Sequence, residues 1–359
     1  MEIIPVNFKR KRYIHFTMKL LFFLSYLLIT LIPAKMFAQE SGSPDDHLPP
    51  NIKRITQFGE RADWSRDGKK ILFLEKTFGD VFEFEIATGK ITLLTGYFYH
   101  GGFTRALYLA NDDILLSGCT SFDAANPGAN RTEKAELWVL DKNLSTPPVR
   151  LGTKCFEGPA VSRKNMRMAW TIMDKQYPGK LRPGQFQIFM ADIIYNNGIP
   201  ELANRKLLLD NLNTDFGGEI ETQNFVPPDE TRLTFSAYGY KNSEVMVLDL
   251  QTGKVSDISN AVKPYDEPEG IFPDGQNTCV ESDRQNLKGS GSVDIWKLRL
   301  DGSGEMTRLT FFSDYPGYKS SNPVISDDGR YMAFQEAYSK DQAGVGHGIF
   351  IMDLLPDSK

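Results

Sequence analysis

Residues 322–334 read NPVISDDGRYMAF, a pattern that predicts a short apolar strand, a tight Asp-Gly turn and a second apolar strand. The pattern recurs at residues 62–73 as ADWSRDGKKILF and, in a weaker form, at residues 270–280 as GIFPDGQNTCV. A supersecondary unit that recurs along a chain is typical of repeat folds. The recurrence therefore predicts an all-β protein whose sheets are built from one repeated unit.

Six cycles of this unit can be traced through the chain. In the first cycle we expect strands around Trp64 and at residues 71–75, 81–86 and 91–95. The later cycles occupy residues 101–152, 155–210, 215–260, 265–312 and 314–359. A cycle of four strands matches one blade of a β-propeller.

The last cycle lacks a fourth strand, whereas a lone strand, Arg54–Phe58, precedes the first cycle. Its sequence, RITQF, resembles RLTFF at Arg308–Phe312, where the fourth strand of the fifth cycle is expected. We therefore expect the N-terminal strand to complete the last blade and close the ring, which removes the exposed edges of a linear array. The sequence predicts a six-bladed β-propeller over residues 53–359. An open β-solenoid would leave the lone strand unexplained.

The recurring phrase W/I-S-x-D-G-x-x-I/M-x-F, most complete at residues 64–73 and 325–334, resembles the WD-type propeller repeat of the TolB family. The resemblance covers nearly all of residues 53–359, and it implies a propeller fold and a location in the cell envelope. TolB proteins also carry an α/β domain before the propeller. Only a short leader precedes the propeller in this sequence, so the resemblance is to the propeller alone.

Residues 1–38 are typical of a secretory signal peptide. A basic segment, Lys9–Arg12, precedes an apolar run, Leu20–Pro33, which is shorter than the ~20 residues of a membrane-spanning helix. Met18 begins a more typical signal and is an alternative start, and an uncleaved anchor is an alternative fate. Residues 39–52 are rich in Ser, Pro and Asp and predict a flexible leader. We expect a periplasmic or secreted protein with no membrane span after cleavage.

The charge of the mature chain argues against nucleic acid as a partner. Without residues 1–38 the chain has 35 Lys and Arg against 45 Asp and Glu, a formal charge of −10. An acidic protein with no basic stripe repels phosphate backbones.

Three cysteines, Cys119, Cys155 and Cys279, are present. Disulfides form in exported proteins, and Cys119 and Cys155 are expected at the same end of the fold. The sequence therefore predicts a possible Cys119–Cys155 disulfide, with two free thiols as the alternative. Cys279 is expected in the middle of a strand, buried and inert.

Long connections are concentrated on one predicted face of the propeller. They join the second and third strands of a blade, or one blade to the next, at Thr120–Lys134, Asp174–Gln185, Ser282–Val293 and Ala337–His347. Function tends to lie on loops that a rigid scaffold holds. We therefore predict a binding surface on this face and at the mouth of the central channel. The candidate residues are Tyr99, His100, Arg105, Glu157, Glu219, Glu221, Tyr265, Glu267, Glu269, Asp314, Tyr315, Tyr318 and Lys319.

Five of these candidates, Glu157, Glu219, Glu221, Glu267 and Glu269, stand at or just before the starts of predicted inner strands. Inner strands line the channel, so the carboxylates are expected to converge there. Such a cluster suits Ca²⁺ or a basic peptide, although EF-hand spacing is absent. A solvated acidic rim is the alternative. No cofactor is expected, and Ca²⁺ is left open.

The sequence supports two hypotheses of function. The first is a monomeric, non-catalytic binding or scaffold module for a protein, a peptide or a glycan, whose sugars could stack on the aromatic candidates. The second is a polysaccharide lyase or hydrolase that uses Glu157, Glu267 or Glu269 as acid or base, with or without a divalent metal. Oligogalacturonate lyases use related propellers with a multi-histidine metal site. Only His100 and His347 lie in the propeller here, which makes that site hard to assemble.

Overall fold

The computed structural model describes residues 40–342 and 344–355. The predicted signal peptide, residues 1–38, and the alternative start at Met18 lie outside the described residues. The chain divides into two units, Met1–Glu40 and Ser41–Lys359, and the strands described below belong to the second. Among the described residues no helix is long and apolar enough to span a membrane.

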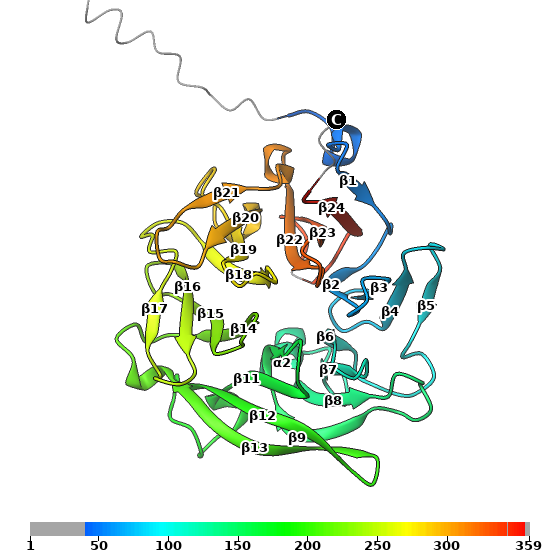
Figure 1. Cartoon of the computed structure of the whole chain (residues 1–359), viewed down its shortest axis with the longest axis vertical. Helices are drawn as coiled ribbons and strands as arrows, with labels where there is room; N and C mark the ends of the chain where they lie inside the picture. The colour runs from blue at the N-terminus through cyan, green and yellow to red at the C-terminus, as the bar shows by residue number, and fades with distance from the viewer. Residues whose placement is uncertain (1–39, 343, 356–359) are drawn as a thin grey trace, which may run out of the picture. The chain divides into compact units, whose positions relative to one another are not determined.

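The described residues form six antiparallel sheets of four strands each. The first blade contains β2 (Glu60–Trp64), β3 (Lys70–Leu74), β4 (Val81–Glu85) and β5 (Ile91–Leu93). The second contains β6 (Phe103–Tyr108), β7 (Ile114–Gly118), β8 (Glu136–Leu140) and β9 (Val149–Lys154). The third contains β10 (Phe156–Val161), β11 (Arg167–Met173), β12 (Phe186–Asn196) and β13 (Ile199–Asp210). The fourth contains β14 (Ile220–Val226), β15 (Arg232–Tyr238), β16 (Ser243–Asp249) and β17 (Val255–Asp257). The fifth contains β18 (Asp266–Ile271), β19 (Asn277–Ser282), β20 (Asp294–Arg299) and β21 (Met306–Arg308). The sixth contains β22 (Tyr318–Ile325), β23 (Tyr331–Tyr338), β24 (Ile349–Asp353) and β1 (Ile52–Arg54). Figure 1 shows the blades around a common centre, which confirms the predicted six-bladed β-propeller.

Helices are short and lie in the connections. The α-helix α2 (Pro127–Thr132) follows β7 in the second blade. The 3₁₀ helices are η1 (Pro44–His47), η2 (Asp174–Gln176), η3 (Asn211–Asn213), η4 (Ser290–Ser292) and η5 (Phe312–Asp314).

The hydrophobic core lies between the blades. The buried apolar side chains of the described residues form six clusters, each drawn from two neighbouring blades. Alternate residues of one strand serve both neighbours: in β3, Leu72 and Leu74 pack towards the second blade, and Ile71 and Phe73 towards the sixth. Both faces of each middle strand are therefore buried, which explains why these strands read as continuous apolar runs.

The N-terminal strand closes the ring, as the sequence predicts. β1 pairs antiparallel with β24, with Ile52 opposite Met352 and Arg54 opposite Phe350, and Figure 1 shows the two strands side by side. The ladder lies earlier than expected: it spans Ile52–Arg54 rather than Arg54–Phe58. The predicted position was wrong by a few residues because the RITQF phrase marks a different contact.

That contact is a hydrogen bond to a threonine hydroxyl that lies just after the outermost strand, in the sixth blade and in the fifth. Thr56 Oγ1 accepts a hydrogen bond from the Ile349 backbone N–H at 2.8 Å. Thr310 Oγ1 accepts the equivalent bond from Ile295 at 2.8 Å. The threonine shared by RITQF and RLTFF therefore fixes the outermost strand to the start of the third strand.

Each of the six inner strands contains a β-bulge or irregularity in its pairing. Three non-glycine residues in these strands adopt positive φ: Arg61 at 55°, Glu157 at 61° and Asn322 at 48°. Left-handed backbone costs such residues about 1–3 kcal/mol each. Bulges redirect side chains locally, and these redirect polar side chains towards the centre of the ring.

The predicted Cys119–Cys155 disulfide is absent, and among the described residues all three cysteines are buried free thiols. The Cys155 N–H bonds to the Ala135 carbonyl on one side, and Cys119 follows Gly118, which pairs with Glu136 on the other. The chain of β8 thus separates the two cysteines. Two strand spacings amount to roughly 9–10 Å between Cα atoms, beyond the ~7 Å limit for a disulfide.

Candidate functional site

A ring of glutamates lines the centre of the propeller. Glu stands five residues before the turn-opening residue in four of the six inner strands, at Glu60, Glu157, Glu221 and Glu267. All four are buried. Because the inner strands meet at the centre, the shared position in the repeat brings these carboxylates to the channel.

Three arginines, Arg61, Arg105 and Arg131, form ion pairs with this ring. Arg61, at the bulge of β2, lies with Nε 3.5 Å from Glu60 Oε1. Burial, with the nearby Arg105 guanidinium, lowers the pKa of Arg61 to about 10. Arg131 reaches the ring from α2 and donates a hydrogen bond to Glu157. The connection that carries α2 therefore supplies part of the channel lining.

Arg105, on β6, lies between two further carboxylates. Its Nη2 is 3.8 Å from Glu221 Oε1 and 3.6 Å from Glu269 Oε1. At these distances the charged groups form ion pairs, but the atoms are too far apart for hydrogen bonds. Asn322 Nδ2 donates to Glu269 at 3.0 Å.

Two tyrosines connect the carboxylates of Glu221 and Glu267. The Tyr238 hydroxyl lies 2.7 Å from Glu221 Oε2 and also contacts Glu267 Oε1. Tyr265 donates to the other oxygen of Glu267. One hydroxyl carries one proton, so Tyr238 can bond both carboxyl groups only when one of them is protonated. The arrangement is a proton-sharing chain.

The pKa shifts agree with this chain. Burial, followed by repulsion from Glu157 and Glu267, holds the pKa of Glu221 well above its ordinary range. Burial, followed by Glu269 and Glu267, raises the pKa of Glu281 to about 8. Burial also raises the pKa of Glu269, although Arg105 acts in the opposite direction. Burial therefore favours the neutral, protonated form of these three carboxyl groups.

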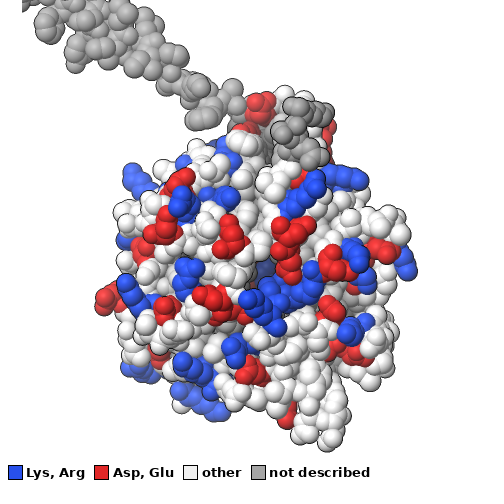
Figure 2. All heavy atoms as spheres, viewed as in Figure 1, with Lys and Arg blue, Asp and Glu red and all other residues white. Residues whose placement is uncertain are grey.

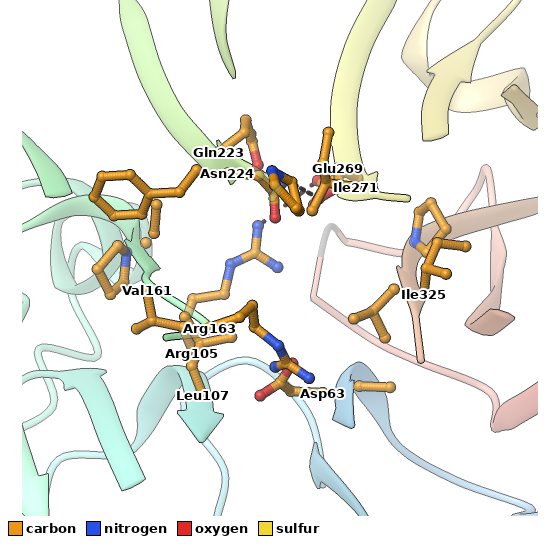
Figure 3. Close-up of a pocket in the computed structure, with 18 of the residues that line it drawn as sticks. Asp63, Arg105, Leu107, Val161, Arg163, Gln223, Asn224, Glu269, Ile271 and Ile325 are labelled. Carbon is orange, nitrogen blue, oxygen red and sulfur yellow. Dashed lines mark hydrogen bonds and ion pairs between the residues drawn. The ribbon is translucent and has the colours of Figure 1, made fainter. Parts of the chain in front are cut away.

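Two cavities meet in the channel. We call the first the channel mouth: it has a volume of about 240 Å³ and is lined by Glu267, Glu281, Lys319 and residues of the long connections. We call the second the turn-side cavity: it has a volume of about 320 Å³ and extends to the tight turns at the opposite end. The two share Arg61, Arg105, Glu269 and Asn322. Figure 2 shows basic and acidic side chains side by side around the hollow at the centre, and Figure 3 shows Arg105 reaching across the turn-side cavity towards Asn224 and Glu269.

The structure brings about half of the predicted site residues together. Those in or directly bonded to the channel cluster are Arg105, Glu157, Glu221, Tyr265, Glu267, Glu269 and Lys319.

Three predicted residues lie away from the channel. Tyr99 is 86% exposed and, with His100, lines a separate hollow over the first two blades. His100 is held in place, with Nε2 3.0 Å from Asp80 and Nδ1 accepting from the Gly102 N–H. Glu219 is exposed and lines neither channel cavity.

The other three form a group near the sixth blade. Asp314 pairs with Arg308 at 2.6 Å. The Tyr315 ring stacks on His47, and Tyr318 packs edge-on against Tyr338. Because Tyr338 lines the channel mouth, Tyr318 borders the site without entering it.

Sequence reasoning missed Glu60, Arg61, Arg131 and Tyr238, and for the segment Glu281–Arg284 it favoured a local ion pair over ligand binding. Glu60 had a signal, because it occupies the same repeat position as Glu267. The position of Arg131 depends on how the connection around α2 folds, and no periodic pattern marks it. Tyr238 and Glu281 lie at the ends of second strands, where the sequence pattern shows only that side chains are near the channel face.

The carboxylate oxygens of the cluster already have donors. Guanidinium groups, tyrosine hydroxyls and the Asn322 amide approach them. Among the residues that the structure describes, no group of three or more His, Cys, Asp or Glu side chains is placed to hold a metal ion.

Comparison with known proteins supports the fold. No family model and no curated protein sequence matches the chain. Among solved structures, a gluconolactonase from Xanthomonas campestris is similar at a TM-score of 0.53 and 11% identity, over 84% of this chain and 88% of that one. An oligogalacturonate lyase from Vibrio parahaemolyticus is similar at 0.50 and 13%, over 86% and 94%. TolB from Acinetobacter baumannii is a more distant match at 0.43 and 18%, over 83% and 68%. At such identities the likeness shows the propeller fold alone.

Proposed function

We propose that the protein is a periplasmic or secreted binding module whose channel mouth takes a saccharide unit of a glycan. The observation that carries this proposal is the dense set of polar side chains in the mouth, with acids and bases in equal number. Its lining carries four carboxyl groups and four basic groups: Glu60, Glu267, Glu269, Glu281, Arg61, Arg105, Arg131 and Lys319.

Because burial raises the pKa values of Glu269 and Glu281, the mouth has no net negative charge. A basic peptide would need such charge, whereas the polar groups of the mouth suit a ligand rich in hydroxyl groups. Planar carboxylate and guanidinium groups offer paired acceptors and donors to adjacent hydroxyls. Tyr265 and Tyr338 add aromatic surface at the mouth. The volume of about 240 Å³ lies just below the usual range for small-molecule pockets, so a single sugar unit fits better than a protein segment.

The test is a binding screen of the monomeric protein against neutral and acidic mono- and oligosaccharides, followed by calorimetry on the ligands found. We expect Glu267→Gln and Tyr265→Phe each to raise the Kd about tenfold, because the first replaces a carboxylate oxygen, an acceptor, by an amide NH₂ donor and the second removes a hydroxyl group. Glu305→Gln is the matched control, since its side chain is exposed on the fifth blade. A chain that binds basic peptides but no saccharide would overturn the proposal.

A second candidate is a carbohydrate hydrolase or lyase, and the Glu221–Tyr238–Glu267 chain favours it. A carboxyl group that keeps its proton beside an ionised partner has the properties of a general acid–base pair. Incubation with oligosaccharides, analysed by mass spectrometry with and without EDTA, tests this function. Turnover that is lost in Glu221→Gln while saccharide binding persists would establish it over simple binding.

A further inference from the structure

The turn-side cavity has an apolar wall and a polar end. Leu107, Val161, Ile271 and Ile325 line the wall together with prolines such as Pro159. Figure 3 shows these aliphatic side chains around the space that Arg105 enters. The cavity extends to the tight turns, opposite the long connections, and its inner end is formed by Arg105, Glu221 and Glu269 of the channel cluster.

The Arg105 guanidinium at the polar end has unused hydrogen-bonding capacity. Within residues 40–342 and 344–355 it makes no hydrogen bond, and its ion pairs to Glu221 and Glu269 are longer than a hydrogen bond. Its position depends on Gly158: a Cβ there would lie 2.5 Å from Arg105 Cγ. The inner strand of the third blade therefore leaves room for this side chain to cross into the cavity.

Gln223, on β14, supplies a second unused donor. Its residue exposure is 9%, and its amide Nε2 is buried without a partner among the described groups. Leaving such a donor unsatisfied is unfavourable. Arg105 and Gln223 both line the turn-side cavity, and each carries an N–H donor that has no hydrogen-bond partner among the described residues.

The charges of the cavity lining favour an anion. The lining contains four cations, Arg61, Arg105, Arg163 and Lys164, and four acids, Asp63, Glu221, Glu269 and Asp327. Burial raises the pKa of Asp63, Glu221 and Glu269. Each shift favours the neutral form of the acid, which reduces the negative charge beside the Arg105 guanidinium.

We propose that the turn-side cavity is a second binding site, which takes a small monocarboxylate with an apolar body. The carboxylate accepts hydrogen bonds from Arg105 and Gln223, and the apolar body packs against Leu107, Val161, Ile271 and Ile325. A guanidinium fork matches the two oxygens of a carboxylate. The volume of about 320 Å³ is at the lower end of the range for small-molecule sites.

The probes are straight-chain and branched carboxylates from butanoate to octanoate, with benzoate and phenylacetate, each paired with its primary amide. Binding to the intact protein is measured by calorimetry and by ligand-observed NMR. We expect at least one carboxylate to bind at least tenfold more tightly than its amide. Arg105→Gln should abolish that preference, and Arg299→Gln, at an exposed arginine, should keep it.

Gln223→Leu separates binding from folding. The substitution removes a buried amide that has no partner, so the melting temperature of the free protein should rise or stay unchanged. Carboxylate binding should nevertheless weaken about tenfold. Gln251→Leu, at an exposed turn, is the matched control and should leave it unchanged.

Gly158→Ala is an independent steric test, because the added methyl group displaces Arg105 without changing any charge. It should weaken carboxylate binding as well. The proposal is overturned if no carboxylate binds, if each binds no better than its amide, or if Gln223→Leu and Gly158→Ala both bind carboxylate as the parent does. Gln223 does not line the channel mouth, so Gln223→Leu should keep saccharide binding, and failure of one site is distinguishable from failure of the other.

Discussion

Glu281 is a residue whose burial links stability to pH. It lies opposite Glu267 in the fifth blade and accepts a hydrogen bond from the Asn322 N–H at 2.6 Å. Its pKa is about 8 in the folded chain against an ordinary 4.5. Between these values the folded state holds a proton that the unfolded state has released. The free energy of unfolding should therefore fall as pH rises from 4.5 to 8, by up to about 1.4 kcal/mol per pH unit for this group.

Glu281→Gln, which stays neutral at all these pH values, should flatten part of that slope. Urea unfolding at pH 5, 6.5 and 8 measures it. Glu305→Gln, at an exposed side chain, should keep the full slope. Equal slopes in the parent and in Glu281→Gln would show that Glu281 does not hold its proton in the folded state.

Single residues also mark the limit of prediction from sequence. The repeat position of Glu267 shows that its side chain lies at the channel, and the structure places it there. The same reasoning fails for Glu219, which lies only two residues before Glu221. Glu219 precedes the first residue of β14, and its side chain is exposed. No sequence pattern marks the Gln223 amide, because its lack of a hydrogen-bond acceptor depends on how the surrounding strands pack.

At the scale of secondary-structure elements, a threonine hydroxyl accepts a hydrogen bond from the third strand of a blade and so holds the fourth strand in place. Thr56→Ala should leave the Ile349 N–H buried without this partner and lower the free energy of unfolding by about 1–2 kcal/mol. Thr310→Ala should cost a similar amount, since Thr310 occupies the same place in the fifth blade.

Chemical denaturation of both variants, beside Thr56→Ser and Thr310→Ser, measures these changes. The serine variants retain the hydroxyl and should recover most of the loss. A Thr56→Ala protein as stable as its parent would mean that the bond does not help to hold the closing strand.

Most strands could be predicted because Asp-Gly turns and continuous apolar runs mark the first three strands of a blade. The outermost strand is harder to predict, since β1 has only three paired residues and the threonine that recurs in RITQF and RLTFF lies after them. The long strand β12 runs from Phe186 to Asn196. Its last residues pair with β13, a contact between segments that a local pattern does not reveal.

At the scale of the whole molecule, the two ends of the propeller are joined only by non-covalent pairing. Lys53 and Ile351 are opposite one another in that pairing, and Lys53 is exposed. Antiparallel partners lie about 4.5–5.5 Å apart at Cα, within disulfide range. Lys53→Cys combined with Ile351→Cys should therefore form a bond that stabilises the ring by a few kcal/mol, at most about 5.

Melting temperatures with and without dithiothreitol measure the effect in one protein. The single variant Lys53→Cys should show no such dependence. If the double variant has the same melting temperature in its oxidised and reduced forms, unfolding does not begin at the pairing of β1 with β24.

The pairing of β1 with β24 also sets an order of events in time. Ribosomes make about 5–20 residues per second, so the strand at Ile52–Arg54 waits on the order of 15–60 s before its partner at Ile349–Asp353 is made. During that interval five blades can form, but the sixth cannot. A chain released early, or one cut near its end, keeps an open strand edge that can pair with another chain. Completion of synthesis is thus a condition for solubility as well as for shape.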